Sequence, residues 1–316
     1  MRQKSIKNIR KEFAKHGIFY TPPDLAEKLK SYVDIEPESV YDPTCGSGAL
    51  LKVFPDNAKK YGQELDGEQL GLININNFKG YVGDTLTDDG FAGMEFDCII
   101  ANPPFSVKWN PEQLREDVRF KDCPALPPPS KADWAFMLHI LHHLAEDGIA
   151  VVLGFPGILY RRNKEAIVRK YFIENNFIER VVQVPGNTFE DTAISTCILV
   201  LRKNKNTTDI IFEDEKHQAT VPQAVVAEND YVLSVNSYIE NETPNEVIDI
   251  DSVNRTVVLD LLKKVENTFV LLVSLQQNFK ENFYIDELRQ GLEDILKKYQ
   301  KIEKNVDKGN PCDRLH

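Results

Sequence analysis

The chain has 316 residues, of which 42% are hydrophobic and 28% are charged, and its mean hydropathy is -0.36. This composition excludes general disorder, and the lack of an apolar run of about 18 residues excludes a membrane span. A net charge of -11 argues against a chain that binds nucleic acid unaided. Five scattered cysteines without a Cys-x-x-Cys pair argue against a disulfide framework or a structural zinc site. The sequence thus predicts a soluble, globular, cytoplasmic protein.

The N-terminal segment, residues 1–18, is basic. Residues 1–17 contain six Lys or Arg and a single acid, Glu12. No hydrophobic stretch follows them, so a secretory signal peptide is not predicted. The segment is compatible with contact to phosphate or with a solvated helix end, and the sequence leaves both open.

Residues 39–201 carry the pattern of an α/β domain, which we place at residues 19–205. Short apolar runs rich in β-branched residues alternate with helical patterns, which predicts a doubly wound sheet with helices on both faces. The clearest helix is predicted over residues 132–144, where apolar residues share one face and Gly148 follows. Strands are predicted at residues 40–41, 59–64, 80–84, 96–101, 149–154, 178–184 and 196–201.

A long connection interrupts this domain at residues 106–131. It holds several prolines and mixed charge, and a loop of that length is usually functional or mobile. After the domain, residues 206–250 are predicted to form an irregular extension with strand-like pieces at 210–212 and 231–235.

The last segment, residues 251–316, is predicted to be a helical tail. Aliphatic residues recur there at helical spacing from residue 257 to 275 and from residue 288 to 302. Two long amphipathic helices are expected, and their apolar stripes suit association with another helical surface. The alternative is that the tail folds back on the catalytic domain or pairs with itself.

The first candidate site is the heptapeptide DPTCGSG at residues 42–48, between a predicted strand and a helix that begins at Ala49. Its glycines allow a tight turn and close approach of backbone N–H groups to a ligand, and a helix N-terminus favours an anionic group. Alone, this pattern is equally compatible with a simple turn. Cys45 within it is interpreted as a small packing residue.

Two carboxylates follow the next strands. Glu64 ends the second predicted strand, where a doubly wound fold typically presents an acid to the hydroxyls of a ribose. Asp84 ends the third, where it could accept a hydrogen bond from an adenine amino group. Taken separately, each acid is also compatible with a solvated strand end.

The most specific signal is the tetrapeptide NPPF that follows the fourth predicted strand, Asn102-Pro103-Pro104-Phe105. An exocyclic base amine is a poor nucleophile because its lone pair is delocalised into the ring, and two acceptors aimed at its hydrogens relieve this. The side-chain oxygen of Asn102 and the carbonyl of Pro103 can be those acceptors, since consecutive prolines hold the backbone rigid. Phe105 then offers a stacking face for a flipped base.

The set and order of these motifs resemble the γ-class amino-methyltransferases that methylate adenine N6 in DNA with S-adenosylmethionine, and more narrowly the modification (M) subunits of type I restriction-modification systems. The resemblance covers about residues 13–238. It rests on FYTP at 19–22, DPTCGSG at 42–48, NPPF at 102–105, KADWAF at 131–136, GFPGIL at 154–159, TFEDTAIST at 188–196 and LSVNSY at 233–238.

The resemblance implies a Rossmann-like S-adenosylmethionine-dependent methyltransferase fold and a role for each matching residue. The cofactor would be held by Phe19, Tyr20, Thr21, Pro22, Asp42, Gly46, Ser47, Gly48, Ala49, Glu64 and Asp84. The catalytic tetrapeptide would be Asn102, Pro103, Pro104 and Phe105, with Phe105 and Phe189 stacking on the target base. At Ala49 the family more often has glycine. M subunits also usually carry a helical domain ahead of the first motif, whereas residues 1–18 alone precede Phe19 here.

The resemblance further implies partners. They are DNA and a separate specificity (S) subunit that reads the site, with two M subunits per S subunit. A restriction subunit is left open as a further partner, and the tail at 251–316 would be the docking surface. The net charge and the lack of a sizeable basic module after residue 184 argue against a chain that reads several base pairs alone.

Two other interpretations stay open at the level of sequence. The same tetrapeptide could act on RNA or on a glutamine side chain of a protein, or the chain could be an inactive assembly subunit that kept the fold. No metal is expected. His139, His142 and His143 fall on one predicted helix, but no glutamate motif or cysteine pair accompanies them.

Overall fold

The computed structural model describes residues 21–186 and 195–239, together with residues 290, 291 and 293. The chain divides into two compact units, residues 1–241 and residues 242–316. In the second unit the three described residues are helical and exposed. The basic segment at 1–18 and the rest of the predicted tail helices lie outside the described residues.

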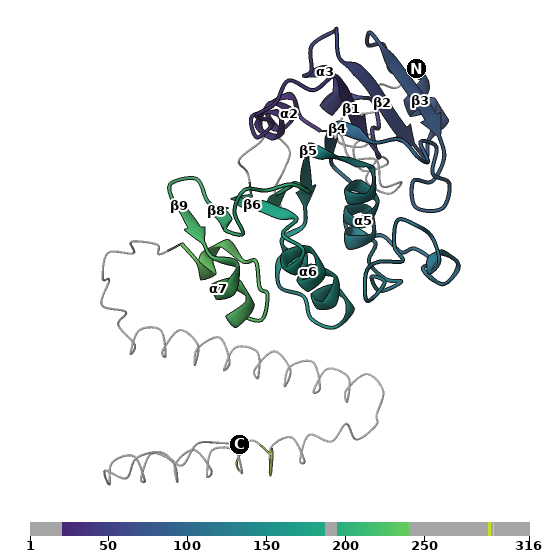
Figure 1. The fold of residues 1–316 in the computed structure, drawn as a ribbon. Coiled ribbons are helices and arrows are strands. Elements are labelled where there is room, and N and C mark those ends of the chain that lie inside the picture. The colour runs from purple at the N-terminus through teal and green to yellow at the C-terminus, as the bar shows by residue number, and fades with distance from the viewer. Residues whose placement is uncertain (1–20, 187–194, 240–289, 292, 294–316) are drawn as a thin grey trace, which may run out of the picture. The chain divides into compact units, whose positions relative to one another are not determined.

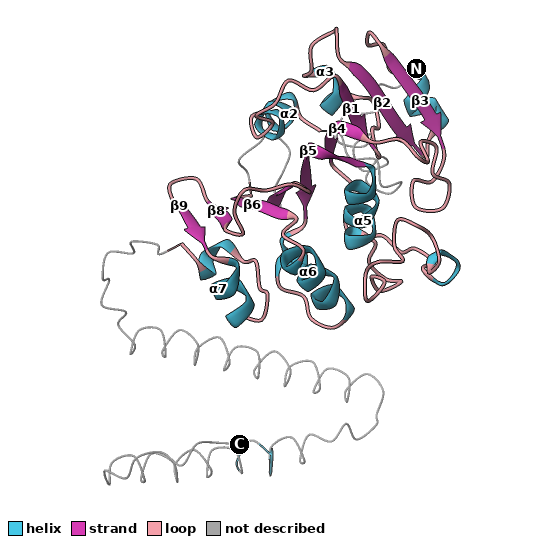
Figure 2. Ribbon diagram, in the orientation of Figure 1, coloured by secondary structure: helices cyan, strands magenta, loops and turns pink. Residues whose placement is uncertain are grey.

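The described part of the first unit forms a nine-stranded sheet with the order β3-β2-β1-β4-β5-β7-β6-β8-β9 (Figures 1 and 2). The strands are β1 Ser39–Asp42, β2 Lys59–Glu64, β3 Phe78–Val82, β4 Phe96–Ala101, β5 Leu144–Gly154, β6 Ile178–Val184, β7 Thr196–Leu201, β8 Ile210–Glu213 and β9 Gln218–Val221. Strands β3, β2, β1, β4 and β5 are parallel. Strand β7 is antiparallel to both β5 and β6, so the sheet is mixed.

Helices cover both faces of this sheet, as predicted. They are α2 Pro23–Lys30, α3 Ala49–Lys52, α4 Gly67–Gly71, α5 Asp133–His143, α6 Lys164–Glu174 and α7 Gln223–Glu228, with short 3-10 turns at η1 Glu112–Leu114, η2 Pro156–Leu159 and η3 Val235–Ser237. Along β4, Ile99 packs into the core under α5 and α6, whereas its neighbours Cys98 and Ile100 pack into the core under α2 and α3. This alternation is the period-two pattern of a strand buried on both faces. The doubly wound Rossmann-like fold is therefore confirmed.

Local chemistry explains two of the helices that cover the sheet. Helix α2 begins after Pro22 and has Asp24 in its first turn and lysines in its last, which suits the helix dipole. Helix α5 is apolar nearly all round and almost fully buried. Its Trp134 ring lies 5.1 Å from that of Phe172 on α6, which joins the two helices on one face.

The predicted strands match the observed ones within a few residues, with two differences at their ends. Strand β3 ends at Val82 rather than at residue 84, so Asp84 lies in the turn beyond it. Strand β5 begins at Leu144, immediately after α5, and a bulge against β4 accommodates the exposed residues before Gly148. The strand-like piece at 210–212 is confirmed as β8, which with β9 extends the same sheet.

The prediction of a strand-like piece at 231–235 is wrong. Asp230 and Tyr231 have φ of 51° and 55°, which breaks an extended conformation. The Tyr231 N–H donates to the Val226 carbonyl at the end of α7, and the Leu233 N–H donates to the Leu159 carbonyl. The alternating apolar residues are therefore buried by a loop that packs on η2, and not by a strand ladder.

The long connection at 106–131 is folded back on itself and includes η1. The Trp109 backbone N–H donates to the Pro129 carbonyl at 3.0 Å, and its indole Nε1 donates to the Pro128 carbonyl at 3.0 Å. The Ala132 N–H donates to the Val107 carbonyl, which closes the connection at the start of α5. The prolines predicted to make this loop unusual thus supply acceptors that hold its first part.

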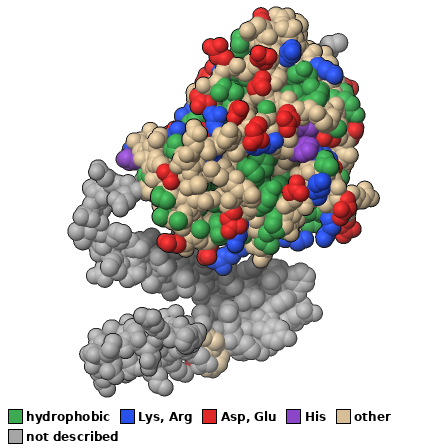
Figure 3. Space-filling view, viewed as in Figure 1, with side chains coloured by type: hydrophobic (Ala, Val, Ile, Leu, Met, Phe, Trp, Pro, Cys, Tyr) green, Lys and Arg blue, Asp and Glu red, His purple; other side chains and the backbone are tan. Residues whose placement is uncertain are grey.

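The described surface mixes charges of both signs. On the face shown in Figure 3, acidic and basic side chains are interspersed among hydrophobic ones. Among the residues that the structure describes, no helix is both long enough and apolar enough to cross a bilayer.

Candidate functional site

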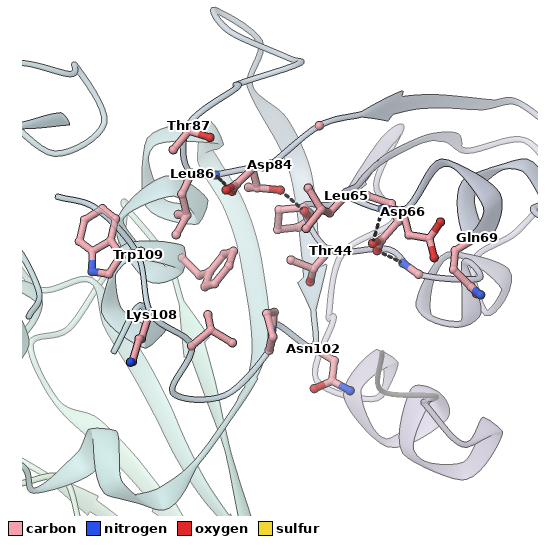
Figure 4. Close-up of a pocket in the computed structure, with 18 of the residues that line it drawn as sticks. Thr44, Leu65, Asp66, Gln69, Asp84, Leu86, Thr87, Asn102, Lys108 and Trp109 are labelled. Atoms are coloured by element: carbon pink, nitrogen blue, oxygen red, sulfur yellow. Dashed lines mark hydrogen bonds between the residues drawn. The ribbon is translucent and has the colours of Figure 1, made fainter. Parts of the chain in front are cut away.

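A cleft of about 790 Å³ lies at the carboxyl ends of the parallel strands β1 to β4. Five predicted site residues line it, and they come from four different loops: Gly46, Glu64, Asp84, Asn102 and Pro104. In Figure 4, Trp109 and Lys108 lie at one end of the cleft and Gln69 at the other, with Asn102 between them. This is the edge at which open α/β sheets bind ligands, because the strand ends and the loops that follow them converge there.

The glycine turn after β1 has the backbone that the sequence predicts. Gly46 and Gly48 have φ of +50° and +75°, where a side chain would be strained. The turn is closed by the Gly48 N–H, which donates to the Cys45 carbonyl at 2.7 Å. Helix α3 behind it is only four residues long, so the expected attraction of an anion by a helix N-terminus is not supported.

Asp42 lies beneath this turn and does not line the cleft. Its carboxylate Oδ1 accepts a hydrogen bond from the Thr44 N–H at 3.0 Å. The side chain is 1% exposed, and burial raises the pKa of Asp42 to about 8 despite that hydrogen bond. Asp42 therefore shapes the turn from inside the protein.

Cys45 packs in the core beside the turn, which confirms its interpretation as a packing residue. Burial raises the pKa of its thiol well above the ordinary range. A Cβ on Gly62 of β2 would come within 2.7 Å of the Cys45 sulfur, so the strand and the turn pack too closely for any larger side chain there.

Glu64 joins two of the cleft loops. Its Oε2 accepts a hydrogen bond from the Gly46 N–H at 2.8 Å, and its Oε1 accepts one from the Asp66 N–H at 3.1 Å. Both partners are uncharged backbone amides, which leave the carboxylate further lone pairs for a ligand donor. This geometry suits the predicted contact with ribose hydroxyls.

Asp84 lies at the start of the turn after β3. Its Oδ1 accepts a hydrogen bond from the Leu86 N–H at 3.0 Å. Leu86 and Thr87 line the cleft with it, so a carboxylate and an apolar side chain are presented together. That combination can accept from an amino group and pack against a flat ring.

The tetrapeptide after β4 contributes Asn102 and Pro104 to the cleft, while Pro103 is buried. The Asn102 Nδ2 donates to the Thr21 Oγ1 at 3.2 Å. The amide oxygen of Asn102 is therefore the atom that can accept from a ligand. Phe105 does not line the cleft, and its ring lies 6.4 Å from that of Phe155.

The other predicted residues fall outside the cleft or outside the described residues. Thr21 and Pro22 are buried beside it at the start of α2. Ser47 and Gly48 belong to the glycine turn and Ala49 begins α3, and none of the three lines the cavity. Phe19, Tyr20 and Phe189 lie outside the residues that the structure describes.

Sequence reasoning missed several cleft residues. Leu65 follows Glu64 directly and is 70% exposed at the cleft, and an apolar residue just after a strand-end acid could have signalled it. Lys108 and Trp109 come from the long connection, four and five residues after Pro104. The unusual length of that loop was a signal, although it did not indicate which residues face the cleft.

A group of possible metal ligands lies below the cleft in the described part of the chain, formed by Asp89, His139 and His143. Both ring nitrogens of His139 are already engaged, one 3.1 Å from the Arg119 guanidinium and one 3.1 Å from the Tyr41 hydroxyl. A guanidinium at that distance would repel a cation. The group is better described as a buried hydrogen-bond network.

Comparison with known proteins places most of the chain in one family. The family model for N-6 DNA Methylase matches residues 5–224. A methylase subunit of the type I restriction enzyme MpnII from Mycoplasma pneumoniae is 32% identical, over 84% of this chain and 61% of that protein. The MjaVII methylase subunit from Methanocaldococcus jannaschii is 30% identical, over 92% of this chain and 54% of that protein. The chain thus spans about half to three fifths of the length of these relatives.

Among solved structures, the methyltransferase subunit of a type I restriction-modification system from Streptococcus thermophilus superposes with a TM-score of 0.65 and 28% identity. The match covers 71% of this chain and 59% of that one. The matched family region contains Gly46, Glu64, Asp84, Asn102 and Pro104, which the fold brings to one cleft. The chain belongs to the N-6 DNA methylase family.

Proposed function

We propose that this chain is the methylase (M) subunit of a type I restriction-modification system and that it transfers a methyl group from S-adenosylmethionine to adenine N6 in DNA. The main observation in support of this proposal is that Glu64, Asp84 and Asn102 line one cleft. The relatives that match the chain include several type I methylase subunits, which supports the DNA substrate over RNA or a protein glutamine.

The cleft fits the cofactor by its chemistry. Three carboxylates that accept hydrogen bonds from backbone amides line it, those of Glu64, Asp66 and Asp84. The apolar side chains of Leu65 and Leu86 line it as well. In the proposed arrangement Glu64 accepts from the ribose hydroxyls and Asp84 accepts from the cofactor adenine. When bound, the cofactor supplies an electrophilic methyl group on a sulfonium sulfur.

The residues after β4 would then prepare the target amine. Because Thr21 takes the amide NH₂ of Asn102, the Asn102 oxygen can accept one hydrogen of the amine, and the Pro103 carbonyl can accept the other. This favours a pyramidal nitrogen with its lone pair directed at the methyl carbon. With the cofactor bound, the N–C bond would form as the C–S bond breaks, and the nitrogen would then lose a proton to solvent. Much of the acceleration would come from positioning.

The second part of the proposal concerns partners. The net charge of -11 disfavours independent binding to a phosphate backbone. We therefore propose a separate S subunit that selects the site, with two M subunits per S subunit. Residues 251–316 would dock on it, on the grounds of their helical pattern in the sequence.

A methyl-transfer assay tests the activity. The chain is incubated with labelled S-adenosylmethionine and with DNA, RNA or protein acceptors, each with and without the products of neighbouring genes. Label on adenine N6 of DNA that requires an S subunit is expected. Label on RNA or glutamine would assign another acceptor, and no transfer to any acceptor with a complete complex would indicate an inactive assembly subunit.

A truncation tests the docking role of the tail. Removal of the residues after about 251 should leave cofactor affinity intact while it abolishes the complex with the S subunit and site-specific methylation. If the truncated chain still methylates a defined DNA site by itself, the idea of a separate reader is wrong.

A further inference from the structure

We propose that Arg119, a buried residue of the long connection, is a positioning residue for cofactor binding. It would hold the turn after β3, which carries Asp84 and Leu86, in the conformation that faces the cleft. The inference deepens the proposed function and rests on it, because it assumes that the cofactor occupies this cleft.

The guanidinium of Arg119 donates hydrogen bonds directly to the backbone of that turn. Its Nη1 donates to the Thr85 carbonyl at 2.7 Å, and its Nη2 donates to the Leu86 carbonyl at 2.8 Å. Arg119 is 6% exposed. Thr85 and Leu86 both line the cleft. The positions of two adjacent peptide groups in the wall of the cleft therefore depend on one buried side chain.

The side chain is itself held in place by its charge partners. Its Nε and Nη2 donate to the two oxygens of Asp117 at 2.9 and 2.7 Å, which fixes the plane of the guanidinium group. Burial alone would raise the pKa of Asp117, but the hydrogen bonds from Arg119 bring it below its ordinary value. Asp89 lies 3.9 Å from the Nε. The two carboxylates thus balance the buried positive charge of Arg119 at the position where it contacts the turn.

The same side chain links the turn to the rest of the cleft. The Arg119 Nη1 lies 3.1 Å from the His139 Nδ1 on α5, and His139 in turn contacts the Tyr41 hydroxyl of β1. The Thr85 hydroxyl donates to the Pro43 carbonyl in the loop after β1. Arg119 therefore connects the long connection, the turn after β3 and the loop after β1, all of which line the cleft.

Lysine cannot replace this arrangement. A lysine keeps the positive charge but presents a single ammonium, which cannot hold two successive carbonyls and a carboxylate in one plane. Loss of the guanidinium leaves the carbonyls of Thr85 and Leu86 without this donor, and the turn can then change its conformation. The expected consequence is weaker cofactor binding and not a slower chemical step, since Asn102 has no contact with Arg119 in the described structure.

Calorimetry with the full chain and S-adenosylmethionine tests this. Arg119→Lys is expected to raise the Kd by about 10-fold or more, with a binding stoichiometry near one. The rate of DNA methylation at saturating cofactor, measured with the S subunit, should stay within about threefold of the wild type. Arg180→Lys is the matched control, because Arg180 is partly buried and ion-paired but its partner, Glu213, lies on the far half of the sheet.

The stoichiometry separates positioning from folding. A variant that is merely unstable loses binding sites while the Kd of the folded fraction stays the same, and that result would overturn the inference. So would a Kd within twofold of the wild type in both Arg119→Lys and the companion variant Asp117→Asn. If the wild-type chain itself binds no cofactor, the proposed function fails, and the inference fails with it.

Discussion

In the half of the sheet that carries the cleft, the carboxylates at the strand ends bond to backbone amides, as Glu64 does with Gly46 and Asp66. In the half formed by β6 to β9, carboxylates pair with arginines instead. Glu213 pairs with Arg180, and Glu179 pairs with Arg202. Both halves belong to one sheet with a continuous hydrophobic core on each face.

This difference shows where the fold leaves capacity for a ligand. A carboxylate paired with an arginine is neutralised, and its lone pairs are shared with a charged donor. A carboxylate held by backbone amides is not neutralised by its partners and can accept from further donors. The ion-paired carboxylates of β6 to β9 therefore stabilise the sheet, while Glu64 and Asp84 at the cleft keep acceptor capacity for a ligand.

The largest expected effect comes from Asn102→Ala, which removes the side-chain acceptor for the amine. Methyl transfer should fall by about 100-fold or more, as when one donor is removed from an oxyanion hole. The Kd for S-adenosylmethionine should stay within about twofold, because the Asn102 oxygen is proposed to meet only the target. Calorimetry and a transfer assay measure the two quantities. An equal loss of cofactor binding would make Asn102 a structural residue.

The comparison between the two halves is tested most directly by Glu64→Ala against Glu213→Ala. Glu64→Ala removes bonds to two cleft loops as well as the proposed ribose contact, so the Kd for the cofactor should rise by about 10- to 100-fold. Glu213→Ala removes an ion pair on the other half and should leave the Kd unchanged. Similar Kd changes in both variants would contradict the distinction between the two halves of the sheet.

A smaller effect is expected from Thr21→Val, which removes the acceptor that orients the Asn102 amide. The transfer rate at saturating cofactor should fall by about 10-fold, because the amide is free to rotate its oxygen away from the target. Thr21→Ser keeps the hydroxyl and should restore most of the rate. A raised cofactor Kd with an unchanged rate would show instead that Thr21 serves the cofactor, as the family resemblance implies.

The smallest effect is a change in stability with pH at Asp42. Because burial raises its pKa from 3.8 to about 8, the folded chain binds this proton more tightly than the unfolded chain. Its contribution to the free energy of unfolding therefore falls as the pH rises from about 4 to about 8. Asp42→Asn does not titrate there.

Urea unfolding of the wild type and Asp42→Asn at pH 5 and pH 8.5 measures this. The variant should gain stability relative to the wild type at the higher pH, by on the order of 1 kcal/mol or more. A difference that is the same at both pH values would show that Asp42 titrates normally in the folded protein.

Some features followed from short stretches of sequence. The glycine turn and NPPF were located because their conformations depend on adjacent residues, and the strands matched because burial on both faces produces apolar runs that are visible in sequence. The prediction of a strand-like piece at 231–235 is wrong for the converse reason. Its alternation resembles a strand, but Asp230 and Tyr231 adopt positive φ, which residue type alone does not reveal.

The sequence by itself thus determined the fold class, the family and the acids and amide at the strand ends. Only the tertiary structure decided which side chains support them. Thr21 reaches Asn102 across 81 positions of the chain, and Arg119 reaches Thr85 across 34. A lone arginine in a loop has no periodic pattern, and its role depends on which carbonyls the fold brings within hydrogen-bond distance. Local sequence encodes backbone conformation, whereas contacts between distant segments exist only once the core has packed.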